Sequence, residues 1–532
     1  MAMKGEQPAA GGPASPVESP ASNGGLSWRQ HALVVAAIVL APSLAYAPAM
    51  NRVFTIHDTL WYLAELEGST SLWDGLALVD YNRVAKYQQG DTLLFRPVFF
   101  AWSAVQNAVG GYDHVKWNVL HLAAHVGVCV CLYVLLLRVQ PSLFAGLAAV
   151  AFSVHLANFD LVTWNQPGVL PAFALLLLAM VAASPALSGE GTWTREGKAG
   201  YLVSMTLACF AYELAVGASL MVAVIAAWGV RREGARAMAI RAVPAAAPCL
   251  VYLAVFALRW WFLIDSANVE TQAVPDRGFV TSVVDSFRVS FEYLLRFVAF
   301  GGLNYVAGAY QRTGLGHHLG WDWPASGASQ VLAAGIAVAA WLGFSRDAVR
   351  ARVGLIALVL ATIVGHALML CLGRGYDEAT SHGHYMYLFG LFATVLAYSL
   401  VDWRRLPRKN RQWLAGLLLA ATALNAGLVR VYAENLHRSN ARAHHYLSAI
   451  AEFVETHENE PNFSFRIVDP PHELDPRVTM TIGRQSDPRA PTVSPRASEI
   501  LFARHYRETD PRYELEWTGE SLRISDRTSR GP

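Results

Sequence analysis

The sequence predicts a polytopic all-α membrane protein with about eleven transmembrane helices and a small α+β domain after them. Of its 532 residues, 54% are hydrophobic and only 15% are charged, whereas soluble proteins carry about 25% charged residues. Apolar runs of about 20 residues, long enough to cross a bilayer, recur along the chain. These features exclude a soluble multidomain enzyme and a disordered chain, and the net charge of +2 offers nucleic acids no basic surface.

The first 28 residues are rich in Gly, Pro, Ala and Ser and predict a disordered tail. The membrane domain is expected over 29–430. A cleaved signal peptide is the alternative for the first span, because Ala45-Tyr46-Ala47 resembles a cleavage site, but the later spans favour a retained anchor. The predicted spans are 31–49, 116–137, 142–157, 168–184, 200–212, 214–230, 243–263, 326–344, 353–372, 385–401 and 412–430.

The short connections predict the orientation. Segments 231–242, 345–352 and 402–411 together hold twelve Arg or Lys and three acidic residues. The positive-inside rule therefore places them, and the N-terminus, in the cytoplasm. Loop 50–115 and everything after 430 then lie on the external side. Abundant Ala and Arg with few Lys fit a GC-rich bacterial genome, so we expect the bacterial inner membrane.

This topology requires that segment 280–306 does not cross the bilayer. It carries Asp285, Arg288, Glu292 and Arg296, which are costly at the bilayer centre. Its amphipathic pattern predicts a helix that lies on the external interface.

Residues 431–532 predict a small external α+β domain with frayed ends. Tyr446, Leu447, Ile450, Phe453 and Val454 share one helical face. Alternating runs then predict strands near 463–468 and 478–482, and a hairpin of 513–517 with 522–524.

The first external loop holds the main candidates for chemistry. It is too long to be a simple connection. His57-Asp58 follows the first span directly, and Arg96 stands in Phe95-Arg96-Pro97-Val98. A carboxylate at the membrane boundary can take a proton from an acceptor while facing a lipid-borne donor. Capping of a helix that starts at Thr59 is the plain alternative for Asp58, and contact with lipid headgroups is the alternative for Arg96.

Other charged residues stand at predicted span ends. Acidic residues there are functional candidates, although Asp160 and Glu213 could equally pair with arginines. Arg259 precedes Trp260-Trp261, which is typical of an aromatic belt. The last group of candidates is Arg374, His382 and His384, beside Asp377 and Glu378.

No cofactor is predicted. The five cysteines lie in apolar stretches without CxxC or Cys/His spacing, which argues against zinc and disulfides. A divalent metal at His382 and His384 is conceivable, but their spacing with the acids is more typical of a solvated loop.

The order of these motifs resembles the GT-C superfamily of membrane glycosyltransferases, especially protein O-mannosyltransferases and TPR-tailed transmembrane mannosyltransferases. In these families an acidic pair follows the first span, and an F-R-P segment lies in the first external loop. The second span begins with an Asn…His motif. A second external turn, a K-E pair and a late R-Y-x-Y-L segment follow in that order. The matching segments are His57-Asp58, Phe95–Val98, Asn118–His121, His155–Trp164, Tyr212-Glu213 and His384–Leu388. The resemblance covers about residues 30–430, and the chain lacks TPR repeats.

The resemblance implies a GT-C-like helix arrangement and an inverting transfer outside the cytoplasm. A sugar on a polyprenyl phosphate would be attacked by a hydroxyl of a protein, lipid or glycan acceptor. Asp58, beside His57, is then the expected base, and Asp160 and Glu213 are candidates for a second acidic site. Arg96, Arg259, Arg374, His382 and His384 are candidates for binding the donor phosphate.

Two alternatives stay open. His57 replaces the first acid of the family pair, which favours a non-catalytic transporter, flippase or assembly scaffold that retains the same shell. A lipid-sugar polymerase or ligase would keep the donor and change the acceptor.

Overall fold

The structure is a computed structural model, and it describes residues 26–51, 73, 95–110, 113–163, 168–187, 193–263, 279–298, 343–381, 385–468, 505–507 and 509–527. Predictions that concern 57–58, 326–342, 382–384 and 478–482 therefore lie outside the described residues.

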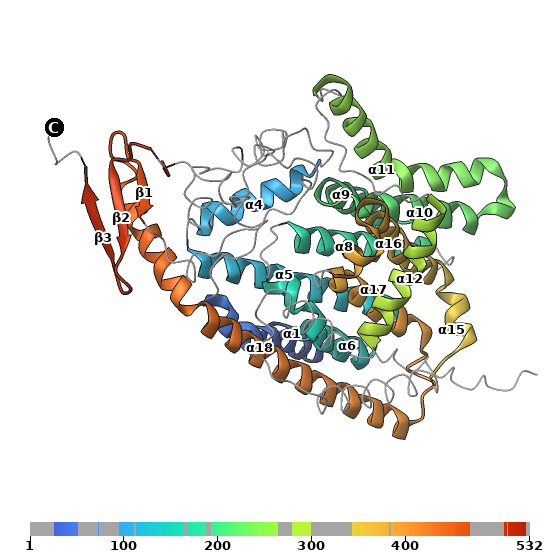
Figure 1. The fold of residues 1–532 in the computed structure, drawn as a ribbon. Coiled ribbons are helices and arrows are strands. Elements are labelled where there is room, and N and C mark those ends of the chain that lie inside the picture. Colours follow the sequence, from blue (N-terminus) through green and yellow to red (C-terminus); the bar gives the residue numbers. More distant parts are fainter. Residues whose placement is uncertain are drawn as a thin grey trace, which may run out of the picture.

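The described chain is almost entirely helical (Figure 1). Its first helices are α1 (Trp28–Tyr46), η1 (Ala47–Asn51), α4 (Pro97–Gly110), α5 (His114–Val139), α6 (Leu143–Ser153), η3 (Leu156–Asn158), α7 (Phe159–Thr163) and α8 (Val169–Leu187). They are followed by α9 (Arg195–Ala211), α10 (Leu214–Gly229), η4 (Arg231–Glu233), α11 (Ala235–Leu263), α12 (Phe279–Val298), α15 (Arg346–Ala351), α16 (Val353–Ser381), α17 (Tyr385–Leu400) and α18 (Arg408–His457).

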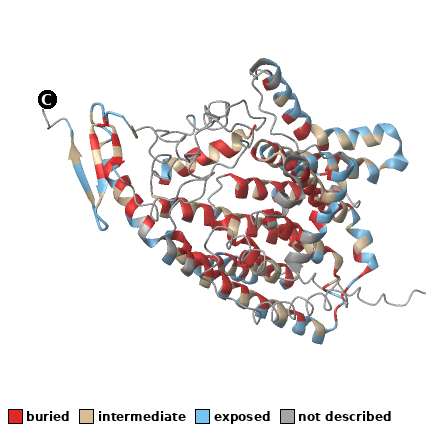
Figure 2. Ribbon diagram, viewed as in Figure 1, coloured by how far each residue is buried: buried red, intermediate tan, exposed pale blue. Residues whose placement is uncertain are grey.

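Helix α5 lies at the centre of the bundle. It packs against α1, α4, α6, α8 and α17, and Trp117, Val128, Leu132 and Leu136 on it are fully buried. Figure 2 shows buried positions gathered in these central helices, with many exposed positions on α11 and α18. Large apolar residues also remain exposed on the outer helices, including Leu33 and Leu40 of α1, as expected of surfaces that face lipid.

Among the described residues, five helices are long and apolar enough to cross a membrane, or six if the bent pair formed by α6 with η3 and α7 is one span. The chain is thus an integral membrane protein. Every predicted span that lies within the described residues coincides with one or more helices. Several of these helices are short, with α8, α10 and α17 among the shorter apolar helices, so the predicted count of about eleven spans is not confirmed.

The α6–α7 segment is broken rather than continuous, with a bend of 51°. Its freed backbone groups find partners on other helices. His125 Nε2 donates to the Ser153 carbonyl at 2.8 Å, and Asn425 Oδ1 on α18 accepts from the Leu156 N–H at 3.0 Å. An irregular backbone at membrane depth requires such internal partners, so the packing of α5 and α18 supports the break.

The structure confirms a helix in the predicted amphipathic segment, α12 (Phe279–Val298), and the two faces of this helix differ. Val280, Val284, Phe287 and Phe291 are exposed along one face. The opposite face buries serines and Tyr293, whose ring stacks on Phe389 of α17 at 4.5 Å. The helix packs against α16 and α17. Its position at the external interface stays a prediction.

The C-terminal strands form a three-stranded sheet, β1 (Phe465–Val468), β2 (Tyr513–Trp517) and β3 (Leu522–Asp526). The β2–β3 pair is antiparallel, which confirms the predicted hairpin. Strand β1 is parallel to β2. The sheet packs on the end of α18, where Tyr446 and Phe453 contact Trp517 and Tyr513. Helix α18 runs unbroken through residue 430, and the separate external domain over 431–532 stays a prediction.

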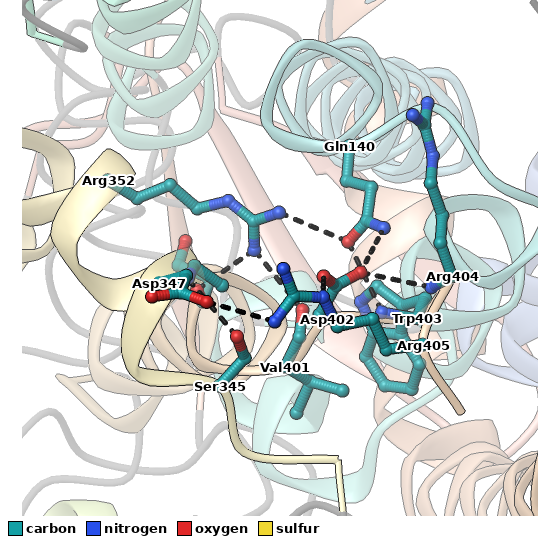
Figure 3. Close-up of polar contacts among 11 residues, drawn as sticks. Gln140, Ser345, Asp347, Arg352, Val401, Asp402, Trp403, Arg404 and Arg405 are labelled. Atoms are coloured by element: carbon teal, nitrogen blue, oxygen red, sulfur yellow. Dashed lines mark hydrogen bonds and ion pairs between the residues drawn. The ribbon is translucent and has the colours of Figure 1, made fainter.

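A polar network closes one end of the bundle (Figure 3). Gln140, at the end of α5, accepts from Arg352 Nη2 at 3.1 Å and donates to Asp402 at 3.1 Å. Arg405 contacts Asp402 and also Asp347 of α15, at 3.2 and 3.0 Å. Two of the basic connections, 345–352 and 402–411, therefore meet at this end. In Figure 1, α15 lies to the right, and α4 and the strands lie to the left.

Candidate functional site

The candidate site is built around an ion pair between the start of α4 and the start of α10. Arg96 precedes Pro97, the first residue of α4, and Glu213 directly precedes α10. Arg96 Nε and Nη2 each lie 2.8 Å from a Glu213 carboxylate oxygen, and Nε also lies 3.0 Å from the second oxygen. Their side chains are 19% and 27% exposed. This is the two-pronged geometry that arginine favours with carboxylates.

Aromatic rings hold the pair in place. The Arg96 guanidinium lies 4.7 Å from the centre of the Tyr212 ring, a distance that favours cation–π attraction. Phe95 packs edge-on against Phe210, and its carbonyl accepts a long hydrogen bond of 3.5 Å from the Tyr252 hydroxyl. The α9–α10 junction and α11 therefore orient the Phe95-Arg96 backbone.

A second guanidinium lies at the same place. Arg259, near the end of α11, is buried, and its Cζ atom lies 5.5 Å from the centre of the Phe95 ring. The predicted site residues Arg96, Glu213 and Arg259 are thus gathered by three elements far apart in sequence. With one carboxylate and two guanidiniums, these three residues carry a formal charge of +1.

The ion pair limits what Glu213 can do. Both carboxylate oxygens accept charge-assisted hydrogen bonds from Arg96. Such two-pronged contacts fix the relative position of the carboxylate and the guanidinium. Glu213 is therefore placed to orient Arg96. This is the structural pairing considered from the sequence.

Asp160 lies in the first turn of α7. Its neighbour Phe159 stacks on Tyr46, at the end of α1, with ring centres 6.0 Å apart. The start of α7 and the end of the first span are therefore adjacent. Asp160 is partly buried, and its neighbour contacts the end of α1, which is followed by η1 (Ala47–Asn51).

The other predicted residues are only partly covered. His57, Asp58, His382 and His384 lie outside the described residues, and Arg374 falls in α16 with its side chain outside them. Among the described residues, no group of three His, Cys, Asp or Glu side chains could hold a metal ion. All five cysteines are free.

Sequence reasoning missed His366 on α16. The side chain is buried, and its ring lies 6.4 Å from that of Tyr212 and 5.9 Å from that of Tyr385. It therefore links the ring beneath Arg96 to the start of α17. Its only signal in the sequence was a histidine within an apolar helix, which is equally typical of a core residue.

Comparison with protein-family models and with curated proteins finds no match. Among solved structures, the chain is similar to ArnT from Cupriavidus metallidurans bound to undecaprenyl phosphate. The TM-score is 0.42 at 13% identity, over 83% of this chain and 84% of that chain. It is also similar to the Archaeoglobus fulgidus oligosaccharyltransferase tethered with an acceptor peptide. There the TM-score is 0.39 at 12% identity, over 83% and 62% of the two chains. At this level neither structure defines a family for this chain.

Proposed function

We propose that the protein is a membrane glycosyltransferase of the GT-C type. It transfers a sugar from a polyprenyl-phosphate donor to an acceptor hydroxyl at the external face of the membrane. The observation that carries the proposal is the gathering of Arg96, Arg259 and the Glu213 carboxylate at the start of α4. That arrangement suits the phosphate of a lipid-linked donor.

In this proposal Asp58 is the general base. It takes the proton from the acceptor hydroxyl, whose oxygen forms a bond to the anomeric carbon of the sugar. The bond between that carbon and the phosphate oxygen breaks, so the configuration inverts and the lipid phosphate leaves as an anion. Arg96 and Arg259 stabilise the charge on the leaving group. His57 supports the base, and Asp160 is the second acid near the same loop.

The orientation belongs to the proposal. The end that holds Gln140 and the basic connections faces the cytoplasm, and the end that holds Arg96 faces outward. Because nucleotide sugars are cytosolic, chemistry on the outer side calls for a lipid-borne donor. An assay with different donors and acceptors decides which sugar is transferred and whether the acceptor is a protein, a lipid or a glycan. The same result decides whether the activity is that of a mannosyltransferase or of a polymerase.

A non-catalytic transporter or scaffold is the second candidate. The closed ion pair between Arg96 and Glu213 favours it, because Arg96 already has a carboxylate partner. The two candidates differ in one respect, since only an enzyme releases polyprenyl phosphate from the donor.

The test uses the purified full chain in lipid nanodiscs with radiolabelled polyprenyl-phosphate sugars and simple acceptors. We expect the wild type to release polyprenyl phosphate, and Asp58→Asn to lose at least about a hundredfold in rate. Glu434→Gln, which removes an exposed carboxylate paired with Arg430 on α18, is the control and keeps the wild-type rate. Equal rates for wild type and Asp58→Asn would exclude Asp58 as the base. No release by the wild type from any donor would favour the scaffold.

A further inference from the structure

Helix α5 carries two buried polar side chains one turn apart, at the point where the second predicted span begins. Asn118 Nδ2 donates to the Met50 carbonyl at 2.8 Å, and His121 Nε2 contacts the Leu161 carbonyl at 2.9 Å. Because a carbonyl oxygen only accepts, Nε2 of His121 carries the proton. Neither interaction takes part in the proposed proton transfer or in the proposed binding of the donor phosphate.

The two carbonyls belong to segments that lead into the acid-bearing loops. Met50 lies in η1, just before the loop with His57 and Asp58. Leu161 lies in α7 and directly follows Asp160. One turn of α5 therefore holds the start of the first loop with one side chain and the Asp160 helix with the other.

Burial makes these two hydrogen bonds hard to replace. Asn118 and His121 are both buried. Loss of either donor would leave a backbone carbonyl without this partner in an apolar interior, which disfavours that arrangement of the backbone. The Tyr46–Phe159 ring stack is a separate contact, which joins the end of α1 to the start of α7.

We propose that Asn118 and His121 are positioning residues, which together set the distance between the start of the first external loop and Asp160. The proposal rests on the proposed function for its catalytic consequence. A transfer reaction needs its proton acceptor and its binding groups held in one geometry, and small misplacements are costly in rate. The spacing of the Asn118 and His121 side chains along a rigid helix supplies that geometry.

The first measurement does not depend on activity. Nitroxide labels at Asn51→Cys and Asp160→Cys, in a background without native cysteines, report the distance between η1 and α7. We expect a narrow distribution in the parent, a broad one in His121→Leu and in Asn118→Leu, and recovery in His121→Gln, whose amide can donate again. His31→Leu is the control, because it removes a 2.7 Å contact with Tyr133 between α1 and α5 but touches neither segment.

The second measurement is sugar transfer by unlabelled variants. We expect His121→Leu to lower kcat about a hundredfold at nearly unchanged KM for the donor, with His121→Gln restoring most of it and His31→Leu staying near wild type. Distances in His121→Leu and Asn118→Leu that match the parent would overturn the proposal. If the wild type transfers no sugar, the proposed function fails, while the distances still decide whether these residues position the two segments.

Discussion

The ion pair between Arg96 and Glu213 changes the role that we assign to Glu213. From the sequence, Glu213 was an acid beside two apolar helices and a candidate for a second acidic site. In the structure both of its oxygens are engaged by Arg96. A carboxylate in that position orients a cation, and the second acid in the proposed reaction is Asp160, whose neighbour Phe159 stacks on Tyr46 at the end of α1.

We therefore expect Glu213→Gln to affect stability more than chemistry. The neutral amide of Gln cannot balance the charge of Arg96. The free energy of unfolding should therefore fall by about 1–2 kcal/mol, which is low for the loss of a hydrogen bond to a charged group because the pair is partly solvated. Sugar transfer should stay within about tenfold of wild type, since Glu213 has no proton-transfer step in the proposed reaction. Denaturant titration in micelles and the transfer assay measure the two effects. Loss of transfer with unchanged stability would instead show that Glu213 takes part in the reaction, either directly or through Arg96.

Asp113 is the N-cap of α5, and its carboxylate accepts from the backbone N–H of Val115 and Lys116 at 3.0 and 3.2 Å. Partial burial raises the pKa of this carboxyl. The hydrogen bonds and the Lys116 ammonium outweigh burial, so that the pKa lies below its ordinary value of 3.8.

We expect Asp113→Ala to destabilise the protein by about 1 kcal/mol at pH 7, the usual cost of losing a cap. Because the folded-state pKa is lowered, the stabilisation is fully present above the unfolded pKa and is lost as pH falls through the folded value. The difference between wild type and Asp113→Ala in denaturant titrations should therefore shrink at pH 3. A difference that is constant from pH 7 to pH 3 would contradict a charged cap.

At the scale of elements, α8 meets α4 through a glycine. Gly168 has φ +86°, and a Cβ atom there would lie 2.6 Å from the Phe99 ring and 2.8 Å from the Phe99 Cα atom. The close approach brings the start of α8 against the helix that begins after Arg96. Both the backbone conformation and the lack of space require glycine at this position.

Gly168→Ala should therefore cost about 2–4 kcal/mol, the sum of backbone strain and overpacking. Gly127, inside α5, is the matched control, because a Cβ atom there meets nothing within 4 Å. Gly127→Ala should be neutral or stabilising by up to about 1 kcal/mol. Thermal unfolding in detergent ranks the two variants, and equal midpoints would show that α4 and α8 adjust more easily than their packing indicates.

At the scale of the whole molecule, the bundle has two different ends. Arg352, Gln140 and the Asp402–Arg405 pair join three connections at one end, while Arg96, Glu213 and Arg259 lie where α4, α10 and α11 meet. Separation of a basic end from the end with the candidate site is what the positive-inside rule predicts for a protein with external chemistry.

Single cysteines in a cysteine-free background test this orientation. Lys116→Cys and Glu520→Cys should react with a membrane-impermeant maleimide in intact cells, because we place α4, the start of α5 and the sheet outside. Arg236→Cys and Arg350→Cys, on the basic connections, should react only after permeabilisation. All four native residues are exposed. The reverse pattern would invert the topology and would place the candidate site in the cytoplasm.

Much of the secondary structure follows from local pattern. Apolar runs predicted α5, α8 and α10 because helix formation satisfies the backbone wherever water is absent. The β2–β3 hairpin followed from alternation around Thr518-Gly519-Glu520, where Gly519 takes φ +99°. The bend of α6–α7 was not predicted, because its partners His125 and Asn425 come from elements far apart in sequence.

The sequence by itself determined that the chain is helical and apolar enough for a membrane, and which residues could carry charge to an external surface. Those properties depend on composition and on short-range periodicity. Only the tertiary structure decided that Arg96 pairs with Glu213 beside Arg259, and that Asp160 lies next to the end of α1. Such contacts depend on which helix faces meet, and that is set by packing between segments more than one hundred residues apart.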